Sequence, residues 1–275
     1  MSNSLAVTGV DTHAHIFRRD LPMSSGRRYS PEYDATIEQY LQYLDQHGFS
    51  HGVLVQPSFL GTDNGYLLEA LKRHPDRLRG TVVVDPDISD AHLDEMAAHG
   101  VVGIRLNLIG KDLDDFSGTH WQHFFKRLAA RSWTVEIQRG MDDLVTILPP
   151  ILDAGVEVIV DHFGLPGRGP EAWQTNEKAF LALLAEGGIW VKVSAAYRSD
   201  SDLAQATSLL AQMRAARGSV DRFLWGSDWP HTRYEQKTAY DDQVRFMEKL
   251  LPEPGERSRI LIRNAAQAFH IALGA

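Results

Sequence analysis

Residues 10–17 read VDTHAHIF, and in this stretch a short apolar segment leads into two histidines separated by one residue. The segment over residues 7–10 is β-branched and shows little polar alternation, which is typical of strands buried on both faces of a parallel sheet. Seven further runs of this kind follow along the chain, at residues 52–56, 80–84, 102–106, 133–138, 156–160, 189–193 and 223–225. The sequence therefore predicts eight buried strands.

The segments between these runs have helical spacing. Apolar residues recur three and four positions apart, as an amphipathic helix requires, at residues 36–44, 66–71, 124–128, 144–152 and 180–184. Eight strands alternating with helices over about 250 residues match a (β/α)₈ barrel in both number and length. No Pro-rich or Ser-rich linker divides the chain. We predict an α/β protein that forms one TIM barrel domain over residues 1–275.

Composition excludes several classes of partner. The 275-residue chain is 43% hydrophobic and 23% charged, with a net charge of −8 and no cysteine. Its lysines and arginines are scattered, so we expect neither nucleic-acid nor anionic-membrane binding. Without cysteine, any metal has to be held by histidine and carboxylate. Residues 1–9 lack the features of a signal peptide, and no apolar run is long enough to span a membrane, so we expect a cytoplasmic protein.

The two histidines of the opening stretch, His13 and His15, come at the carboxyl end of the first predicted strand. Alternate residues of a strand point to the same side, so the two imidazoles face one space. They can bind one divalent cation together, or hydrogen-bond one substrate oxygen. The alternative is a chance pair in a chain that has 12 histidines.

Two more predicted strands end in residues that carry chemistry. His162 follows the sixth strand in VIVDHFG, and Asp228 follows the eighth in FLWGSDWPHT. A carboxylate beside two tryptophans is costly to bury unless it is paired or coordinated. Alone, His162 fits an ordinary hydrogen-bonding histidine and Asp228 a helix N-cap. In a barrel, however, these strand ends meet the first at the mouth where active sites form.

One loop and one further histidine are also expected to border this mouth. Residues 18–30, RRDLPMSSGRRYS, have no regular period and follow the first strand, so they form the first loop on the active-site face. His231, three residues after Asp228, is expected to line the mouth and to orient the aspartate or contact substrate.

The chain resembles the amidohydrolase superfamily, whose barrel carries HxH after strand one, His after strand six and Asp after strand eight. More narrowly, GVDTHAHIF, GIRLNL, IVDHFG, VKVSAAYR and LWGSDWPH are similar to the branch that contains 2-pyrone-4,6-dicarboxylate lactonase and sugar-lactone hydrolases. The resemblance covers essentially the whole chain. It implies a catalytic set of His13, His15, His162 and Asp228.

The chain departs from the wider superfamily at its metal site. Strand four, ending IRLNL, carries no Lys, and strand five, ending VEIQRG, carries no His. A binuclear centre is thus incomplete. We expect no cofactor or one divalent metal, zinc if any, and its ligands would be His13, His15, His162 and Asp228.

The resemblance also implies residues that contact substrate: Arg105, Lys111, Gln138, Arg198 and His231. In the dicarboxylate lactonase an Arg stands where this chain has Leu165, and a Tyr where it has Gln138. These departures speak against the pyrone dicarboxylate itself. Because Arg105, Lys111 and Arg198 place cations around one mouth, a carboxylate-bearing lactone is the expected substrate. The oligomeric state is not indicated.

These residues predict hydrolysis of a cyclic ester. Asp228 acts as general base on a water, while His13, His15 and His162 polarise the lactone carbonyl directly or through one cation. The alternative within enzymes is a zinc-dependent, non-hydrolytic decarboxylase of an aromatic or unsaturated acid. A second alternative is a non-catalytic barrel that binds a small molecule.

Overall fold

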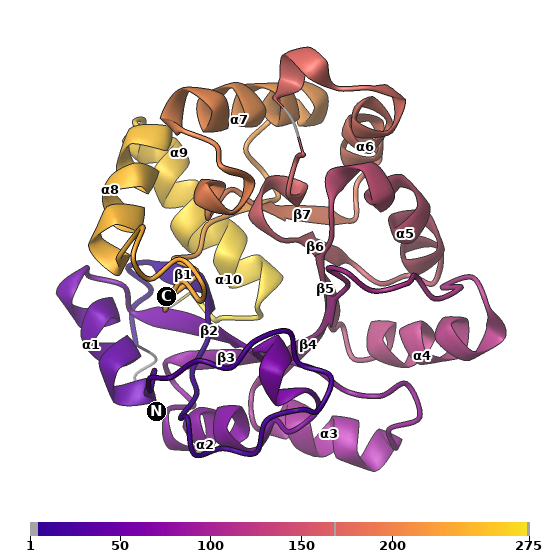
Figure 1. Cartoon of the computed structure of the whole chain (residues 1–275), viewed down its shortest axis with the longest axis vertical. Helices are drawn as coiled ribbons and strands as arrows, with labels where there is room; N and C mark the ends of the chain where they lie inside the picture. The colour runs from indigo at the N-terminus through magenta and orange to yellow at the C-terminus, as the bar shows by residue number, and fades with distance from the viewer. Residues whose placement is uncertain (1–4, 168, 274–275) are drawn as a thin grey trace.

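The computed structural model describes residues 5–167 and 169–273. Eight parallel strands pair in chain order and are surrounded by helices, which confirms the predicted TIM barrel (Figure 1). The strands are β1 (Val10–Ala14), β2 (His51–Val55), β3 (Leu78–Val82), β4 (Val101–Asn107), β5 (Thr134–Gln138), β6 (Val158–Val160), β7 (Ile189–Lys192) and β8 (Phe223–Leu224). The helices are α1 (Ile37–Gln46), α2 (Gly65–Arg73), α3 (Asp90–Ala98), α4 (Thr119–Ala129), α5 (Met141–Asp153), α6 (Thr175–Glu186), α7 (Leu203–Arg217), α8 (Tyr240–Leu250), α9 (Pro254–Ser258) and α10 (Ala265–Ala268).

The first strand lies later in the sequence than residues 7–10, where it was predicted. Pairing with β2 begins at Val10, opposite His51, and continues to Ala14. A strand exists only where a neighbour supplies hydrogen bonds, and periodicity alone does not show where that pairing starts. His13 therefore lies within the strand, and His15 follows it directly.

The chain after β8 closes the barrel against β1. The backbone amide of Thr12 donates to the carbonyl of Trp225 at 3.1 Å, and that of Asp228 donates to the carbonyl of His13 at 2.8 Å. A third bond, from the amide of His15 to the carbonyl of Trp229, measures 2.7 Å. Each of these bonds joins residues 12–15 to residues 225–229, so the ends of the first and last strands lie side by side.

The barrel interior changes from apolar to charged toward the carboxyl ends of the strands. Ile159 and Trp190 belong to a buried apolar cluster that includes Phe269, directly after α10. Two residues further along the same strands come Asp161 and Lys192, both fully buried. Residues two apart share a strand face, so the apolar floor carries a charged layer above it.

The outer helices pack on the barrel through a second apolar cluster. In the part of the chain that the structure describes, no helix combines the length and apolarity needed to cross a membrane.

Candidate active site

The four residues that the sequence singles out for catalysis meet at the carboxyl end of the barrel. Asp228 lies beside the three imidazole rings, and all four side chains are buried. Its Oδ1 lies 3.7 Å from Nε2 of His13, 3.9 Å from Nε2 of His15 and 3.8 Å from Nε2 of His162. The Nε2 atoms of His13 and His15 are 3.3 Å apart. The structure thus places one carboxylate among three imidazoles, away from bulk water.

Two residues of the turn after β7 hold the other oxygen of Asp228. Its Oδ2 accepts hydrogen bonds from the hydroxyl of Tyr197 and from Nε of Arg198. Burial alone would raise the pKa of Asp228, but Arg198 and the imidazoles of His162 and His13 outweigh it and hold the pKa well below its usual range. The carboxylate is therefore ionised at neutral pH. Tyr197 was not predicted, although it stands in the VKVSAAYR motif.

Each imidazole has a partner at Nδ1, which directs its Nε2 toward Asp228. Such partners fix the orientation of a ring and decide which nitrogen carries the proton. They are the backbone carbonyl of Val55 for His15, at 2.7 Å, the hydroxyl of Ser194 for His162, at 3.2 Å, and Nζ of Lys192 for His13, at 2.8 Å.

Beneath the imidazoles lies a charged layer made of Arg105, Glu136, Asp161 and Lys192. Nζ of Lys192 lies 2.6 Å from Glu136 Oε2 and 3.4 Å from Asp161 Oδ1. Arg105 lies 3.6 Å from Asp161 Oδ2 and 3.9 Å from Glu136 Oε1. Two cations thus balance two anions, as burial of charge requires. The sequence analysis assigned no role to Lys192, although a lysine inside an apolar strand indicates a buried charge that needs a partner.

The three imidazoles differ in how their surroundings affect protonation. Burial lowers the pKa of His15 well below its ordinary value and that of His162 to about 3. Burial and Lys192 also act to lower the pKa of His13, but the two carboxylates of the charged layer outweigh them, and the pKa of this ring is raised. His15 and His162 are therefore neutral at physiological pH.

The depressed pKa of His162 predicts a loss of stability in mild acid. The ring titrates at about 3 when folded and near its ordinary value of 6.5 when unfolded, so below 6.5 the unfolded chain binds the extra proton. We expect His162→Gln to reduce the fall in unfolding free energy between pH 6.5 and 5 by roughly 1.1 kcal/mol per pH unit on average, because the unfolded ring is half protonated at the start of this range. Denaturant titrations at several pH values measure the unfolding free energy and so give its slope with pH. His123→Gln, at an exposed position on α4, is the control, and equal slopes in both variants would contradict the prediction.

The four converging groups were predicted to hold one metal if a metal is bound. Their placement suits zinc: Nε2 of His162 and Oδ1 of Asp228 have no hydrogen-bond partner among the described residues, and ligand atoms of His13, His15 and Asp228 lie within 4.8 Å of one another. The position of the proton on His13 does not suit zinc binding. An ammonium group only donates, so Lys192 beside Nδ1 of His13 leaves the proton of that ring on Nε2, where a cation would bind. A cation held by all four residues therefore does not fit.

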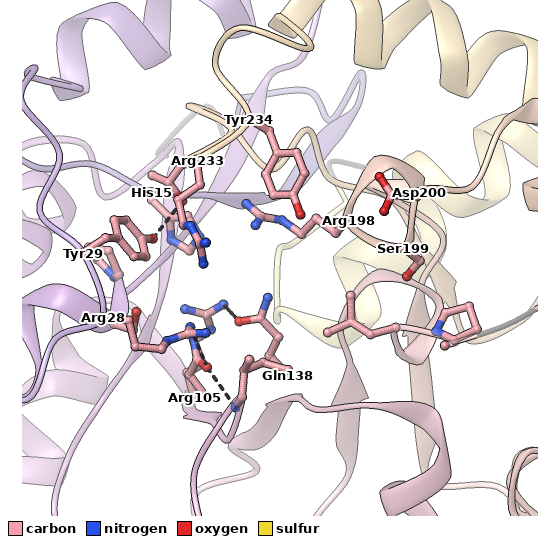
Figure 2. A pocket seen from close by; sticks show the side chains of 18 residues that line it. His15, Arg28, Tyr29, Arg105, Gln138, Arg198, Ser199, Asp200, Arg233 and Tyr234 are labelled. Atoms are coloured by element: carbon pink, nitrogen blue, oxygen red, sulfur yellow. Dashed lines mark hydrogen bonds between the residues drawn. The ribbon is translucent and has the colours of Figure 1, made fainter.

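A cavity of about 400 Å³ opens above this cluster (Figure 2). His15 is the member of the cluster that reaches its wall. The substrate-contact residues predicted from the sequence are divided by the structure. Arg105, Gln138 and Arg198 line the cavity, and Nη2 of Arg105 donates to Oε1 of Gln138 at 2.9 Å. Leu165 also lines it, so the departure from the dicarboxylate lactonase falls on the cavity wall.

Lys111 and His231 are not among the described residues that line this cavity. Lys111 is exposed, and its backbone carbonyl accepts a hydrogen bond from Arg139 at 2.8 Å. His231 is 2% exposed and lines a second cavity, together with Trp229 and Tyr240. The turn after Asp228, in which the backbone amide of His231 donates to the carbonyl of Asp228 at 2.8 Å, brings the histidine to this second cavity, and its position in the sequence does not show that.

Loop residues complete the wall, and the sequence did not single them out individually. Arg28 and Tyr29 come from the loop after β1, which was predicted to lie on this face, and Arg233 and Tyr234 come from the loop after β8. Figure 2 shows the guanidinium groups of Arg28, Arg105, Arg198 and Arg233 directed toward one central space.

Comparison with known proteins agrees with this architecture. A protein of known structure from Pseudomonas putida, assigned as a 2-pyrone-4,6-dicarboxylic acid hydrolase, is 42% identical, with a TM-score of 0.91 over 98% of this chain and 100% of that one. A second from Acinetobacter baumannii, assigned the same activity and solved with citric acid bound, is 36% identical, with a TM-score of 0.90 over 95% of this chain and 99% of that one. The 4-sulfomuconolactone hydrolase of Hydrogenophaga intermedia is 27% identical over 96% of this chain and 90% of its own length.

The amidohydrolase family model matches residues 10–271, which span all eight strands and the four clustered residues. The HxH pair at the end of β1, the histidine after β6 and the aspartate after β8 lie together in the structure, and the chain belongs to the amidohydrolase family.

Proposed function

We propose that this protein hydrolyses a small lactone that carries an anionic group. The observation that supports this most directly is the cavity itself, where four arginines surround a space just above a buried carboxylate and three imidazoles. The similar proteins named above act, by their names, on lactones that carry carboxylate or sulfonate groups.

The arginines of the wall are suited to binding an anion, because two of them have no acidic partner among the described residues. Arg28 and Arg233 form no ion pair with an acidic residue among those described, whereas Arg198 is paired with Asp228. Burial lowers the pKa of Arg28, and the nearby cations Arg233, Arg105 and Arg198 lower it further. Mutual repulsion of this kind is relieved when a carboxylate or sulfonate binds between the guanidinium groups.

In the proposed reaction, Asp228 removes a proton from a water while the water oxygen attacks the lactone carbonyl carbon. The low pKa of Asp228 keeps it in the basic form, and Tyr197 and Arg198 fix its orientation. His162 supports the developing oxyanion, since its Nδ1 can accept the Ser194 proton and its Nε2 is then free to donate. The ring C–O bond breaks, and the leaving oxygen takes the proton from Asp228. The products are a carboxylic acid and a free hydroxyl or its keto form.

A panel of lactones read by proton release tests this proposal. We expect turnover of lactones bearing a carboxylate or sulfonate, and none of neutral lactones with the same ring. The same reactions are monitored for CO₂. Release of CO₂ from an unsaturated acid without lactone opening would favour the decarboxylase alternative, and binding of every anion without conversion would favour the non-catalytic barrel.

The loop arginines predict a selective effect on substrate binding. Arg28→Gln should raise the KM for an anionic lactone about fivefold and leave kcat unchanged, because a partly exposed guanidinium contributes about 1 kcal/mol to holding the substrate in both ground and transition states. Arg27→Gln is the matched control, since Arg27 is the adjacent residue and bonds to Ser30 and Ser24 instead. Equal KM values for the two variants would show that Arg28 does not contribute to substrate binding.

A further inference from the structure

Lys192 is a fully buried lysine that the proposed reaction does not use. It lies at the carboxyl end of β7, and its Nζ is 2.6 Å from Glu136 Oε2, 2.8 Å from His13 Nδ1 and 3.4 Å from Asp161 Oδ1. The two carboxylates form ion pairs with the ammonium group, which is the pairing that a buried cation needs. Two of the ammonium protons are donated, to Glu136 Oε2 and to Nδ1 of His13, and the Asp161 carboxylate adds an ion pair.

These contacts determine where His13 carries its proton. An ammonium nitrogen has no lone pair, so Nδ1 of His13 can only accept from it. In the neutral ring the single proton is then on Nε2. In the imidazolium both nitrogens are protonated. Nε2 of His13 therefore carries a proton in either state, as long as Lys192 stays in place.

The neighbouring ring agrees with this arrangement. Nδ1 of His15 lies 2.7 Å from the backbone carbonyl of Val55, which can only accept, so the proton of His15 is on Nδ1 and its Nε2 is bare. The 3.3 Å between the Nε2 atoms of His13 and His15 then joins a donor to an acceptor. With the opposite tautomer at His13, two lone pairs would face each other at this distance.

We propose that Lys192 is a positioning residue that keeps a proton on Nε2 of His13, so that the HxH pair acts as a hydrogen-bonding pair and not as two ligands of a cation. Lys192 thereby decides whether this constellation binds metal. The consequence for catalysis, that His13 offers a proton to the lactone carbonyl, rests on the proposed function. The consequences for the tautomer of His13 and for metal affinity do not depend on the proposed function.

Removing Lys192 should reverse the tautomer. Nδ1 of His13 also lies 3.3 Å from Glu136 Oε1 and 3.3 Å from Asp161 Oδ1, and neither oxygen has a hydrogen-bond partner among the described residues. Without the ammonium group, a proton on Nδ1 can be donated to these carboxylates, and Nε2 becomes bare. A carboxylate behind a histidine is the usual support of a zinc ligand. The variant should then gain a zinc site that includes His13, His15 and Asp228.

The experiment compares the wild type, Lys192→Met and Lys192→Arg, with Lys72→Met as a control at an exposed lysine of α2. Imidazole ¹⁵N shifts at pH 9 report which nitrogen of His13 is protonated, with His13→Gln for assignment. Zinc affinity is measured by titration calorimetry and by metal analysis after dialysis. We expect the Nε2–H tautomer and no stoichiometric zinc in the wild type, the control and Lys192→Arg. Lys192→Met should show the Nδ1–H tautomer and bind one zinc at least about 100-fold more tightly.

Two outcomes overturn the proposal, and neither depends on lactone turnover. One is an Nδ1–H tautomer of His13 in the wild type, which is decisive even if Lys192→Met does not fold. The other is equal zinc affinity in wild type and variant. Lys192→Met leaves two buried carboxylates with one cation, Arg105. The double variant Lys192→Met with Glu136→Gln therefore provides a second test with one fewer buried charge, and Asp161 remains as the acceptor. If no lactone is hydrolysed but the tautomers are as expected, the proposed function fails and this inference stands.

Discussion

Asp228→Asn should reduce kcat for an anionic lactone by about 10³-fold while leaving the fold intact. The amide has the shape of the carboxylate but no charge and almost no basicity, so it cannot take a proton from water. It also removes the charge that pairs with Arg198 and that lies 3.7 to 3.9 Å from three imidazoles. Stopped-flow or pH-stat assays give kcat, and circular dichroism checks the fold.

Asp200→Asn is the matched control for this change. Asp200 lines the same cavity, but its side chain is largely exposed and its partner Lys237 lies 3.7 Å away at the surface. The same substitution there should change kcat by less than about twofold, since exposed ion pairs contribute little. If Asp228→Asn kept near-normal turnover, another group would have to be the base.

Gly226→Ala should destabilise the protein by at least about 3 kcal/mol, which for a domain of this size lowers Tm by roughly 6 to 12 °C. A Cβ at this position would lie 2.5 Å from the backbone nitrogen of His13 and 2.6 Å from its Cβ. The obstacle is the backbone of β1, which cannot rotate away as a flexible side chain would. The seam between β8 and β1 has to open, and His13 moves with it.

Gly255→Ala provides the comparison, because a Cβ in α9 meets nothing within 4 Å. That variant should be as stable as the wild type or slightly more, since alanine favours helix. Thermal unfolding measures both variants. A Tm for Gly226→Ala within 2 °C of that for Gly255→Ala would show that the seam adapts and that its close packing is not required.

The sequence was sufficient for the barrel and for the four clustered residues. Eight β-branched runs alternating with helical segments determine a (β/α)₈ arrangement, and closure brings the carboxyl ends of all strands to one face. For His13, His162 and Asp228, a position at or near a strand end therefore already implied a shared location. The start of β1 at Val10 was not predicted correctly, because pairing with β2, and not local composition, sets that boundary.

The loop residues could be predicted only as a group. The segment over residues 18–30 was assigned to the active-site face, but that Arg28 and Tyr29 reach the cavity depends on how the loop folds over the barrel. The same limit applies to Lys111 and His231. Each stands in sequence near a strand end, yet the turns that follow direct one to the surface and the other to a second cavity.

The sequence by itself determined which residues stand at the carboxyl ends of the strands, because strand and helix periods are local and a closed barrel converts them into position. Only the tertiary structure decided which residues form the charged layer and which nitrogen of His13 carries the proton. Lys192 and His13 are 179 residues apart, and nothing in either segment indicates a 2.8 Å contact between them. The tautomer of an imidazole depends on the nearest donor or acceptor in space, so it follows from the closed barrel and not from any stretch of the chain.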